Sequence, residues 1–312
     1  MDSLLAILGP TASGKSGLAL DLAERYGGEI VSCDSTAVYR GFDIGTDKVE
    51  PARRRGIPHH LVDVAEPTEE YTAARYAREA AAAIRDIQGR GRWPVLVGGT
   101  GFYYRALTRG LFPGPGRDAA VRRRLERIAD RRGVERLHRL VARVDPDSGR
   151  RIQPRDRRRL VRALEVYYLT GRPLTAHFAE TVSPLEHMEV FAIALKPSRE
   201  EIARRVAARV EEQFARGVVE EVRGLLARGI PESAHPLGGL VYRQVLDLLH
   251  GVRDEAATRA LIVRENLGYA RRQLIWFRKE PNLVWFEGPG DVPATRASVD
   301  SVVAARFHRT FR

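Results

Sequence analysis

The octapeptide GPTASGKS at residues 9–16 constrains the fold of this chain more than any other stretch. It matches the pattern G-x-x-x-x-G-K-[ST], whose glycines allow the backbone to wrap around phosphate oxygens. A short apolar run, LLAIL at residues 4–8, precedes it. The run GLALDLAERYGG follows it, with apolar residues at helical spacing and glycines at its end. Strand, glycine loop and helix in this order predict a working phosphate-binding loop.

Each position of this loop has an expected role. Gly9 and Gly14 let the backbone approach an anion, so that N–H groups and the helix N-terminus face it. Lys15 is expected to reach the outer phosphates, and Ser16 is the predicted Mg²⁺ ligand. The chain has only four lysines among its 52 basic residues, so a lysine here indicates a need for a compact ammonium group. The predicted phosphate-binding residues are Gly9, Pro10, Thr11, Ala12, Ser13, Gly14, Lys15 and Ser16.

The rest of the sequence predicts an α/β fold with a parallel sheet. Strand-like runs alternate with helical ones, and this alternation places helices on both faces of a sheet. One clear helical run is TAARYAREAAAAIRDIQGRG at residues 72–91. The further strand-like runs are GEIVSCD (28–34), HHLVDV (59–64), WPVLVGG (93–99), MEVFAIALKPS (188–198) and NLVWFEG (282–288).

A helical insertion is predicted to interrupt that core. The segment GLFPGPGRD at residues 110–118 is rich in proline and glycine and is typical of a linker. Beyond it the pattern is helical and basic up to about residue 187. We therefore predict a phosphate-loop core formed by residues 1–112 and 188–312, and a basic helical domain at residues 113–187.

Positive charge is concentrated in this insertion. The whole chain carries a net charge of +12, and the segment from Arg117 to Arg162 holds 17 arginines, no lysine and seven acidic residues. An arginine-rich proteome explains the preference for arginine but not the clustering, which is typical of a surface that binds a polyanion. Because the chain has a single cysteine, Cys33, and neither a signal peptide nor a transmembrane run, we expect a cytoplasmic protein that does not bind membranes.

Two more loops are predicted to lie beside the phosphate loop. Asp34 and Ser35 end one strand-like run, and LVGGTG at residues 96–101 ends another. Ligands bind beyond the carboxyl ends of parallel strands, so these residues should share a crevice with Lys15. Asp34 could bind magnesium, act as a general base or cap a turn. Thr100 could donate a hydrogen bond to a phosphate oxygen.

Arginines on two predicted helices could also bind phosphates. The run RIQPRDRRRLVRALEVYYLTGRP at residues 151–173 places Arg158, Arg159 and Arg162 on adjacent turns. Such a face could hold RNA phosphates or close over a nucleotide as a kinase lid does. In EIARRVAARVEEQFARG, residues 201–217, Arg205 and Arg209 lie one turn apart on the same face.

Taken together, these motifs resemble the bacterial tRNA dimethylallyltransferase family. The resemblance is carried, in family order over nearly the whole chain, by GPTASGKS, DSTAVYRGFDIGTDK (34–48), PHHLVDV (58–64), LVGGTG, RI-x-P-x-D…R-ALEVYYLTG and YARRQ-x-x-WFRK. It implies a Mg²⁺-dependent enzyme that transfers a dimethylallyl group from dimethylallyl diphosphate to N6 of the adenosine immediately 3′ of the anticodon in tRNAs. The phosphate loop would then hold the departing diphosphate. The implied partners are the donor and the tRNA anticodon stem-loop, and we expect a monomer.

The resemblance also implies residue roles. Asp34 would take a proton from N6 of an adenosine that has left its stack. Thr100 and Arg209, together with Lys15 and Ser16, would stabilise the charge that grows on the diphosphate. The residues that match tRNA-contacting positions of the family are Asp34, Ser35, Thr36, Ala37, Gly101, Arg123, Arg158, Arg159, Leu160, Val161 and Arg162.

Four positions depart from the family pattern. Ala37 stands where glutamine is usual, Gln153 and Arg155 replace a histidine and an asparagine, and Val241 replaces a glycine. The change at Ala37 bears on how a nucleotide is read beside Asp34. None of the four is a predicted diphosphate-binding residue.

Three other functions share some of these features. A nucleotide or small-molecule kinase would also use a phosphate loop, Mg²⁺ and an arginine lid. A prenyltransferase of free AMP would not need the insertion, whose charge exceeds what a small acceptor requires. A non-catalytic RNA-binding protein switched by a nucleoside triphosphate is disfavoured, because no strand-like run ends in a clear Walker-B aspartate.

Overall fold

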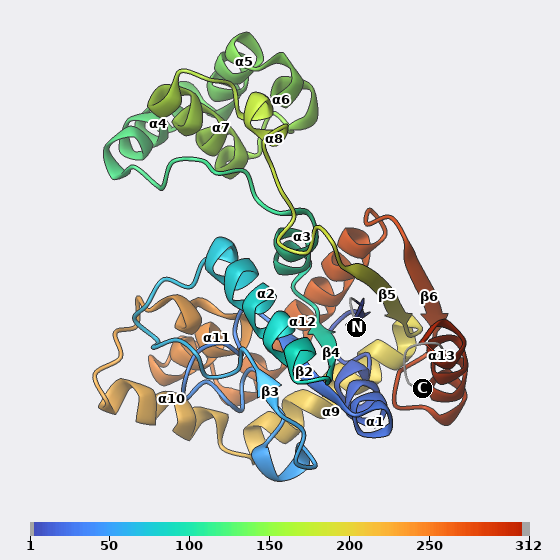
Figure 1. Cartoon of the computed structure of the whole chain (residues 1–312). Coiled ribbons are helices and arrows are strands. Elements are labelled where there is room, and N and C mark those ends of the chain that lie inside the picture. The colour runs from blue at the N-terminus through green and yellow to red at the C-terminus, as the bar shows by residue number, and fades with distance from the viewer. Residues whose placement is uncertain (1–2, 308–312) are drawn as a thin grey trace. The chain divides into compact units, whose positions relative to one another are not determined.

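A six-stranded sheet forms the centre of the core (Figure 1). The computed structural model of the chain describes residues 3–307. Neighbouring strands are parallel throughout, in the order β3-β2-β4-β1-β5-β6, as the alternating sequence predicted. The strands are β1 (Ser3–Leu8), β2 (Gly28–Cys33), β3 (His59–His60), β4 (Trp93–Gly98), β5 (Glu189–Lys196) and β6 (Leu283–Glu287).

Strand β3 is shorter than the predicted run at residues 59–64. Leu61 and Asp63 have φ angles of 61° and 56°, which are left-handed conformations that an extended strand does not contain. The chain therefore turns after His60. The N–H groups of Asp63 and Val64 then donate to the carbonyls of Ala37 and Val38, so the turn supports the segment that follows β2.

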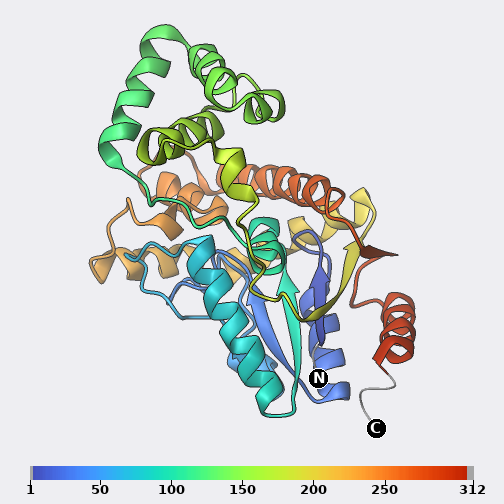
Figure 2. The ribbon, with the colours of Figure 1, turned by 45° about the horizontal axis from the view of Figure 1, so that its top comes forward.

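Helices cover both faces of the sheet (Figure 2). Alternate residues of β1 face opposite ways: Leu5 and Ile7 belong to one hydrophobic cluster, and Leu4 and Leu8 belong to the other. The first cluster includes side chains of α1 (Lys15–Tyr26) and α13 (Pro293–Phe307). The second includes side chains of α2 (Ala73–Gly89), α3 (Gly101–Arg109) and α12 (Glu255–Phe277).

Among the remaining helical segments of the core, α9, α10, η2 and α11 contribute side chains to the second cluster, whereas η1 has no buried residue. Helix α9 begins after Ser198, whose side chain accepts a hydrogen bond from the N–H of Glu201, and this is a standard N-cap. Helices α9 and α12 both contact the phosphate loop, because Ile202, Val206 and Ala270 cluster with Ala12. The segments are η1 (Pro51–Arg53), α9 (Arg199–Ala215), α10 (Val218–Ala227), η2 (His235–Gly238) and α11 (Leu240–Leu249).

Residues Arg109–Pro184 form a second compact unit, which we call the insertion unit. The core unit is Met1–Thr108 with Leu185–Arg312, whereas the sequence prediction placed the boundaries near residues 112 and 188. The insertion unit has its own hydrophobic cluster, which includes Leu125, Leu137 and Val141. Its helices are α4 (Ala119–Arg132), α5 (Val134–Val144), α6 (Pro146–Arg151), α7 (Arg157–Thr170) and α8 (Leu174–Phe178). Across residues 3–307, no helix has the length and apolar character needed to cross a membrane.

Candidate active site

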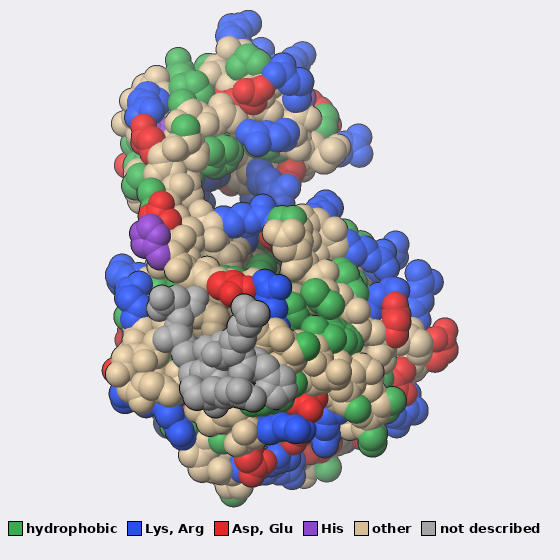
Figure 3. All heavy atoms as spheres, turned by 45° about the vertical axis from the view of Figure 1, so that its right-hand side comes forward, with side chains coloured by type: hydrophobic (Ala, Val, Ile, Leu, Met, Phe, Trp, Pro, Cys, Tyr) green, Lys and Arg blue, Asp and Glu red, His purple; other side chains and the backbone are tan. Residues whose placement is uncertain are grey.

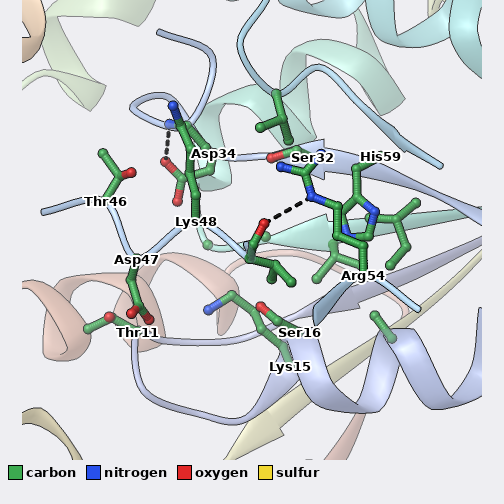
Figure 4. A pocket seen from close by; sticks show the side chains of 18 of the residues that line it. Thr11, Lys15, Ser16, Ser32, Asp34, Thr46, Asp47, Lys48, Arg54 and His59 are labelled. Carbon is green, nitrogen blue, oxygen red and sulfur yellow. Dashed lines mark hydrogen bonds between the residues drawn. The ribbon is translucent and has the colours of Figure 1, made fainter. Parts of the chain in front are cut away.

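Three loops meet at the carboxyl ends of neighbouring strands, as predicted. The phosphate loop follows β1, the Gly99–Thr100 segment follows β4, and Asp34 follows β2, and these strands are adjacent in the sheet. Together they line a cavity of about 150 Å³ (Figure 4). Its walls include Lys15 and Ser16 of α1, Asp34, Gly99 and Arg209. The parallel topology therefore gathers residues that are far apart in the sequence.

The phosphate loop has the backbone geometry that its glycines predicted. Gly14 has a φ of 75°, and a side chain there would also collide with Asp291, whose Oδ1 would lie 2.6 Å from an added Cβ. Ala12 has a φ of 61°, which is a left-handed conformation. Its side chain packs against residues of α9 and α12. The N–H of Gly290 donates to the carbonyl of Ser13 at 2.9 Å. The loop is thus held from outside by the segment after β6.

Lys15 lies where the motif predicted it, at the start of α1. Its Nζ donates to the carbonyl of Pro10 at 3.0 Å. Burial, followed by the positive charge of Arg209, lowers the pKa of Lys15 to about 8, and Asp34 and Asp47 act in the opposite direction. A phosphate anion next to the ammonium group would therefore favour its charged form.

Helix α9 brings Arg209 to the same cavity. Its Nη1 donates to the Thr11 hydroxyl at 2.8 Å, and its Nη2 lies 3.0 Å from Asp47. Arg205, one turn earlier, is instead held by Glu201 and by Asp291. The sequence predicted that both arginines lie on one helical face. Arg209 contacts residues that line the cavity, whereas Arg205 is bonded to Glu201 and Asp291.

Asp34 caps a turn and also faces the cavity. Its Oδ1 accepts hydrogen bonds from the N–H of Thr36 at 2.8 Å, from the Thr36 hydroxyl at 2.7 Å and from the N–H of Ala37 at 3.3 Å. Within residues 3–307, no hydrogen-bond partner is found for its Oδ2. One oxygen fixes the orientation of the carboxylate, and the other can accept a proton.

Thr100 is tied directly to the Asp34 loop. The Thr100 N–H donates to the carbonyl of Cys33 at 3.2 Å, and the Thr100 hydroxyl accepts the N–H of Ser35 at 3.1 Å. Because Oγ1 accepts this bond, its own proton can be donated elsewhere. Gly101 then opens α3, and a Cβ on it would lie 2.1 Å from the Trp276 ring.

Sequence reasoning missed two residues of α12 that complete this site. Tyr269 lines the cavity, and burial, followed by the charge of Asp34, raises the pKa of its hydroxyl. Gln273 also lines the cavity and is hydrogen-bonded to two of the loops. The only available signal was their spacing in YARRQ, which puts both side chains on one helical face.

The cavity continues over an apolar wall. His59 lines this part, and its Nδ1 is paired with the carbonyl of Ile57 at 2.8 Å. Burial lowers the pKa of His59, which favours the neutral imidazole. The apolar residues that line the cavity are Ala19, Ile30, Ala37, Val49, Val62 and Val97.

The insertion unit shows which of its predicted RNA-contacting residues are accessible. Arg123, Arg158 and Arg159 are exposed, and Figure 3 shows basic side chains distributed over the visible face of this unit. Leu160 and Val161, in contrast, are 0% and 2% exposed and belong to the hydrophobic cluster. Their side chains pack inside the unit, so a tRNA contact at these two positions would have to involve the backbone.

Arg162 differs from its neighbours on α7. It donates to Glu165 at 2.8 Å and to the carbonyl of Pro115 at 2.8 Å, and its guanidinium lies over the ring of Phe112. Glu165 is fully buried and also accepts hydrogen bonds from Arg122 and from the N–H of Asp118. Arg162 therefore has a clear structural role within the insertion unit.

The departures from the family pattern lie in three different surroundings. Ala37 is buried and lines the cavity beside Asp34. Gln153 and Arg155 are exposed in the turn before α7, and Val241 is buried on α11. Only Ala37 is in direct reach of a ligand in the cavity.

No protein-only metal cluster is present in the described part of the chain. Residues 3–307 contain no group of three or more His, Cys, Asp or Glu side chains that could hold an ion. The Ser16 hydroxyl is exposed at the first turn of α1, next to Lys15. A cation here would need oxygen ligands from a bound phosphate.

Comparisons with known proteins agree with this geometry. A family model described as IPP transferase matches residues 37–280. A tRNA dimethylallyltransferase of Geobacter metallireducens is 46% identical over 296 residues, which are 95% of this chain and 96% of that protein. One of Halorhodospira halophila is 47% identical over 285 residues, covering 91% and 92% of the two chains.

Solved structures of related enzymes have the same fold. The full-length tRNA isopentenylpyrophosphate transferase of Bacillus halodurans has a TM-score of 0.73 and 33% identity, covering 99% of this chain and 98% of that one. A eukaryotic dimethylallyltransferase that acts on tRNA has a TM-score of 0.79 and 25% identity, covering 100% and 80%.

Proposed function

The chain belongs to the IPP transferase family of tRNA dimethylallyltransferases, and from this premise we propose how its residues share the reaction. The protein is a tRNA-modifying prenyltransferase. It transfers a dimethylallyl group from dimethylallyl diphosphate to N6 of the adenosine immediately 3′ of the anticodon and releases diphosphate. The observation that supports the residue roles is the convergence of the phosphate loop, Asp34 and the Gly99–Thr100 segment.

Lys15 and Arg209 stabilise the leaving diphosphate. Negative charge grows on the diphosphate as the bond between its oxygen and C1 of the dimethylallyl group breaks. The Lys15 ammonium, the Arg209 guanidinium and the N-terminus of α1 provide opposing charge that is already in position. The Thr100 hydroxyl can add a hydrogen bond to a phosphate oxygen. The apolar wall of the cavity is the part that can contact the dimethylallyl carbons.

Asp34 accepts the proton that the adenosine loses. The lone pair of N6 forms the new bond to C1, so N6 then carries one proton too many. That proton passes to Oδ2 of Asp34, because Oδ1 is occupied by Thr36 and Ala37. These hydrogen bonds also keep the carboxylate in one orientation, which favours proton transfer at a fixed position.

The insertion unit binds the backbone of the anticodon stem-loop. Its exposed arginines, among them Arg123, Arg158 and Arg159, can contact phosphates without reading sequence. The target adenosine must leave its stack to reach Asp34. We propose that Ser35, Thr36, Ala37 and Gly101 contact that adenosine and its neighbours. Their position in the loops around Asp34 and Thr100 supports this role.

Mg²⁺ is proposed as the cofactor, with Ser16 as its protein ligand. Mg²⁺ commonly takes few ligands from the protein and completes its shell with substrate phosphates and water. The single exposed hydroxyl of Ser16, beside the predicted diphosphate position, fits this type of coordination better than a carboxylate cluster would. When bound, the ion would neutralise part of the diphosphate charge.

We further propose a monomer that acts in the cytoplasm. One chain contributes all three loops and the basic insertion unit, so the site needs no second copy. The tRNA substrate and the single buried cysteine, Cys33, agree with a reducing cytoplasm.

One assay tests the reaction and its kinase alternative together. Purified protein is incubated with dimethylallyl diphosphate, Mg²⁺ and unmodified tRNA, and the digested nucleosides are analysed by mass spectrometry. We expect prenylated adenosine at the position 3′ of the anticodon. A parallel incubation with γ-labelled ATP should transfer no label to the tRNA or to AMP. Label transfer without prenylation would support the kinase.

A further inference from the structure

A single buried amide joins the phosphate loop to the Thr100 loop. Gln273 on α12 is 6% exposed. Its Oε1 accepts a hydrogen bond from the backbone N–H of Thr11 at 2.8 Å, and its Nε2 donates to the carbonyl of Gly99 at 3.0 Å. One side chain therefore uses an acceptor and a donor at once, each on a different loop of the site.

The two loops are in close contact around this amide. A Cβ added to Gly99 would lie 2.2 Å from Nε2 of Gln273 and 3.2 Å from the carbonyl oxygen of Gly9. Even a methyl group at Gly99 would therefore force the amide or the phosphate loop to move. The Gln273 amide therefore fills the space between the two loops at Gly99.

Helix α12 is anchored on both sides of Gln273. Ala270, three residues earlier, packs with Ala12 of the phosphate loop, and the Trp276 ring, three residues later, lies against Gly101. Arg105 stacks on Trp276, with its guanidinium carbon 4.5 Å from the ring centre, and this limits movement of the indole. Gln273 therefore projects from a helix that is fixed to both loops.

From the two partners of Gln273, further contacts lead to Arg209 on one side and to the neighbour of Asp34 on the other. On one side, the Thr11 hydroxyl accepts a bond from Arg209, which faces the diphosphate position. On the other, Thr100 follows Gly99 directly, and its hydroxyl accepts the N–H of Ser35, next to Asp34. The groups that serve the leaving diphosphate and the attacking N6 are thus linked through one amide.

We propose that Gln273 is a positioning residue that sets the distance between the donor carbon and N6 of the adenosine. The proposal rests on the transfer reaction given above. Removing the amide leaves the phosphate loop and the Thr100 loop themselves intact, so each substrate should still bind in the absence of the other. The chemical step needs both loops at the correct separation, and a displacement of about 1 Å can cost about 10²-fold in rate.

Two variants of nearly the same size test this proposal. In Gln273→Glu, the ionised carboxylate still accepts the Thr11 N–H but places a second oxygen against the Gly99 carbonyl. The protonated carboxyl has one acceptor and one O–H donor, so it restores the wild-type pattern. Gln273→Met lacks both hydrogen bonds at every pH. Burial beside a carbonyl should raise the pKa of the introduced carboxyl, so protonation should occur in an accessible pH range.

The single-turnover rate of each Gln273 variant is measured with both substrates saturating. At each pH, this rate is divided by the wild-type rate at the same pH. At pH 8 we expect both variants to be slower by about 10²-fold, with the affinity for each substrate alone within a few-fold of wild type. As the pH falls toward 5, the ratio for Gln273→Glu should rise by at least tenfold, and the ratio for Gln273→Met should stay constant. Prenyl transfer by the wild-type enzyme, measured in parallel, tests the reaction itself.

Gln244→Met is the matched control. Gln244 is also buried, on α11, and its amide is bonded to Glu265 and Arg253 but to neither loop. We expect this variant to lose stability and keep the wild-type rate per folded molecule. If Gln273→Glu and Gln273→Met show the same ratio at all pH values, or if both lose no more rate than Gln244→Met, the positioning role is refuted.

Discussion

At the scale of single residues, Asp34 shows why the sequence left its role open. A turn-capping aspartate and a general base look alike in a sequence, because both follow a strand and precede polar residues. The structure assigns the capping to one carboxylate oxygen, which accepts three hydrogen bonds from Thr36 and Ala37. The second oxygen accepts none of these three bonds, so turn capping by this side chain is compatible with the proposed role of Asp34 as the base.

Asp34→Asn should slow the chemical step far more than it weakens binding. The amide oxygen of asparagine can accept the same bonds from Thr36 and Ala37, while an NH₂ group replaces the oxygen that takes the proton. We expect a single-turnover rate lower by about 10²–10⁴-fold, the usual contribution of a general base. Equilibrium affinities for the donor and for tRNA should stay within a few-fold. A normal rate in the bound complex would show that Asp34 is structural.

Lys15 should make donor binding depend on pH. Its pKa of about 8 before an anion binds means that the amine loses its proton, and hence its attraction for diphosphate, as the pH rises through 8. We expect diphosphate affinity to fall between pH 7 and 9.5 by at least fivefold. Lys15→Arg keeps a positive charge over this range, so its weaker binding should vary less with pH. Calorimetric titration of both proteins at several pH values decides this; equal slopes would rule out Lys15 as the titrating group.

The residues of the site that sequence could locate are those that follow a strand or complete a motif. Lys15, Asp34 and Thr100 belong to this group, because parallel topology alone brings strand ends together. Gln273 does not, since its partner Thr11 is 262 positions away and no local pattern records the hydrogen bond between them. Leu160 shows the reverse case, in which a matched motif position proved to be a core side chain.

At the scale of elements, helix α7 presents some of its arginines outward and uses another inside its own unit. Arg158 and Arg159 are exposed, while Arg162 is partly buried and bonded to Glu165 and Pro115. Periodicity predicted the helix, but it treats all arginines alike. The difference depends on Glu165, one turn further along, whose burial requires cationic partners.

Strand β3 gives a second example at this scale. The apolar pattern at 59–64 predicted a strand, and the left-handed residues Leu61 and Asp63 ended it early.

Replacing Arg158 and Arg159 with glutamine should flatten the salt dependence of tRNA binding. An arginine that no longer neutralises a phosphate lowers the slope of log K against log salt by about 0.7 to 0.9, so two such arginines lower it by about 1.4 to 1.8. Diphosphate affinity should not change, because both arginines belong to the insertion unit. Filter binding at five salt concentrations measures the slope.

The control for this double variant carries glutamine at Arg25 and Arg223, two exposed arginines of the core unit. It removes the same charge, so a general electrostatic effect would be seen in both proteins. We expect its slope to match wild type. An unchanged slope in Arg158→Gln/Arg159→Gln, with weaker diphosphate binding, would favour the lid interpretation over tRNA binding.

At the scale of the whole molecule, the chain consists of two units with separate hydrophobic clusters. The core unit carries the three loops of the site, and the insertion unit carries most of the excess positive charge. Composition and the proline-glycine linker predicted this division to within a few residues of the structural boundary. The exact boundary depends on which linker residues pack on which unit, and composition does not contain that information.

Glu165→Gln should destabilise the insertion unit and leave the core unit folded. Burial alone would raise the pKa of Glu165, but hydrogen bonds from Arg122 and Arg162 and from the N–H of Asp118 outweigh it and lower the pKa to about 2. A carboxyl whose pKa is lowered by folding stabilises the fold above its unfolded pKa of about 4.5, and this contribution is lost as the pH falls toward 2. Replacing the buried carboxylate leaves two arginines without their partner, which typically costs about 3 to 5 kcal/mol.

The positions of the tryptophans make this destabilisation measurable unit by unit. All three tryptophans, Trp93, Trp276 and Trp285, lie in the core unit, so their fluorescence reports on that unit, whereas far-UV circular dichroism reports on the helices of both. In urea, we expect Glu165→Gln to show an early circular dichroism transition with no change in tryptophan fluorescence, followed by the core transition at its wild-type midpoint. When the pH of the wild-type protein is lowered from 5 to 3, the transition of the insertion unit should move to a lower urea concentration. At concentrations of urea between the two transitions, the variant should bind diphosphate normally and tRNA weakly. If circular dichroism and tryptophan fluorescence shift together, the two units unfold as one. Loss of tRNA binding could then not be assigned to the insertion unit separately from the phosphate-binding core.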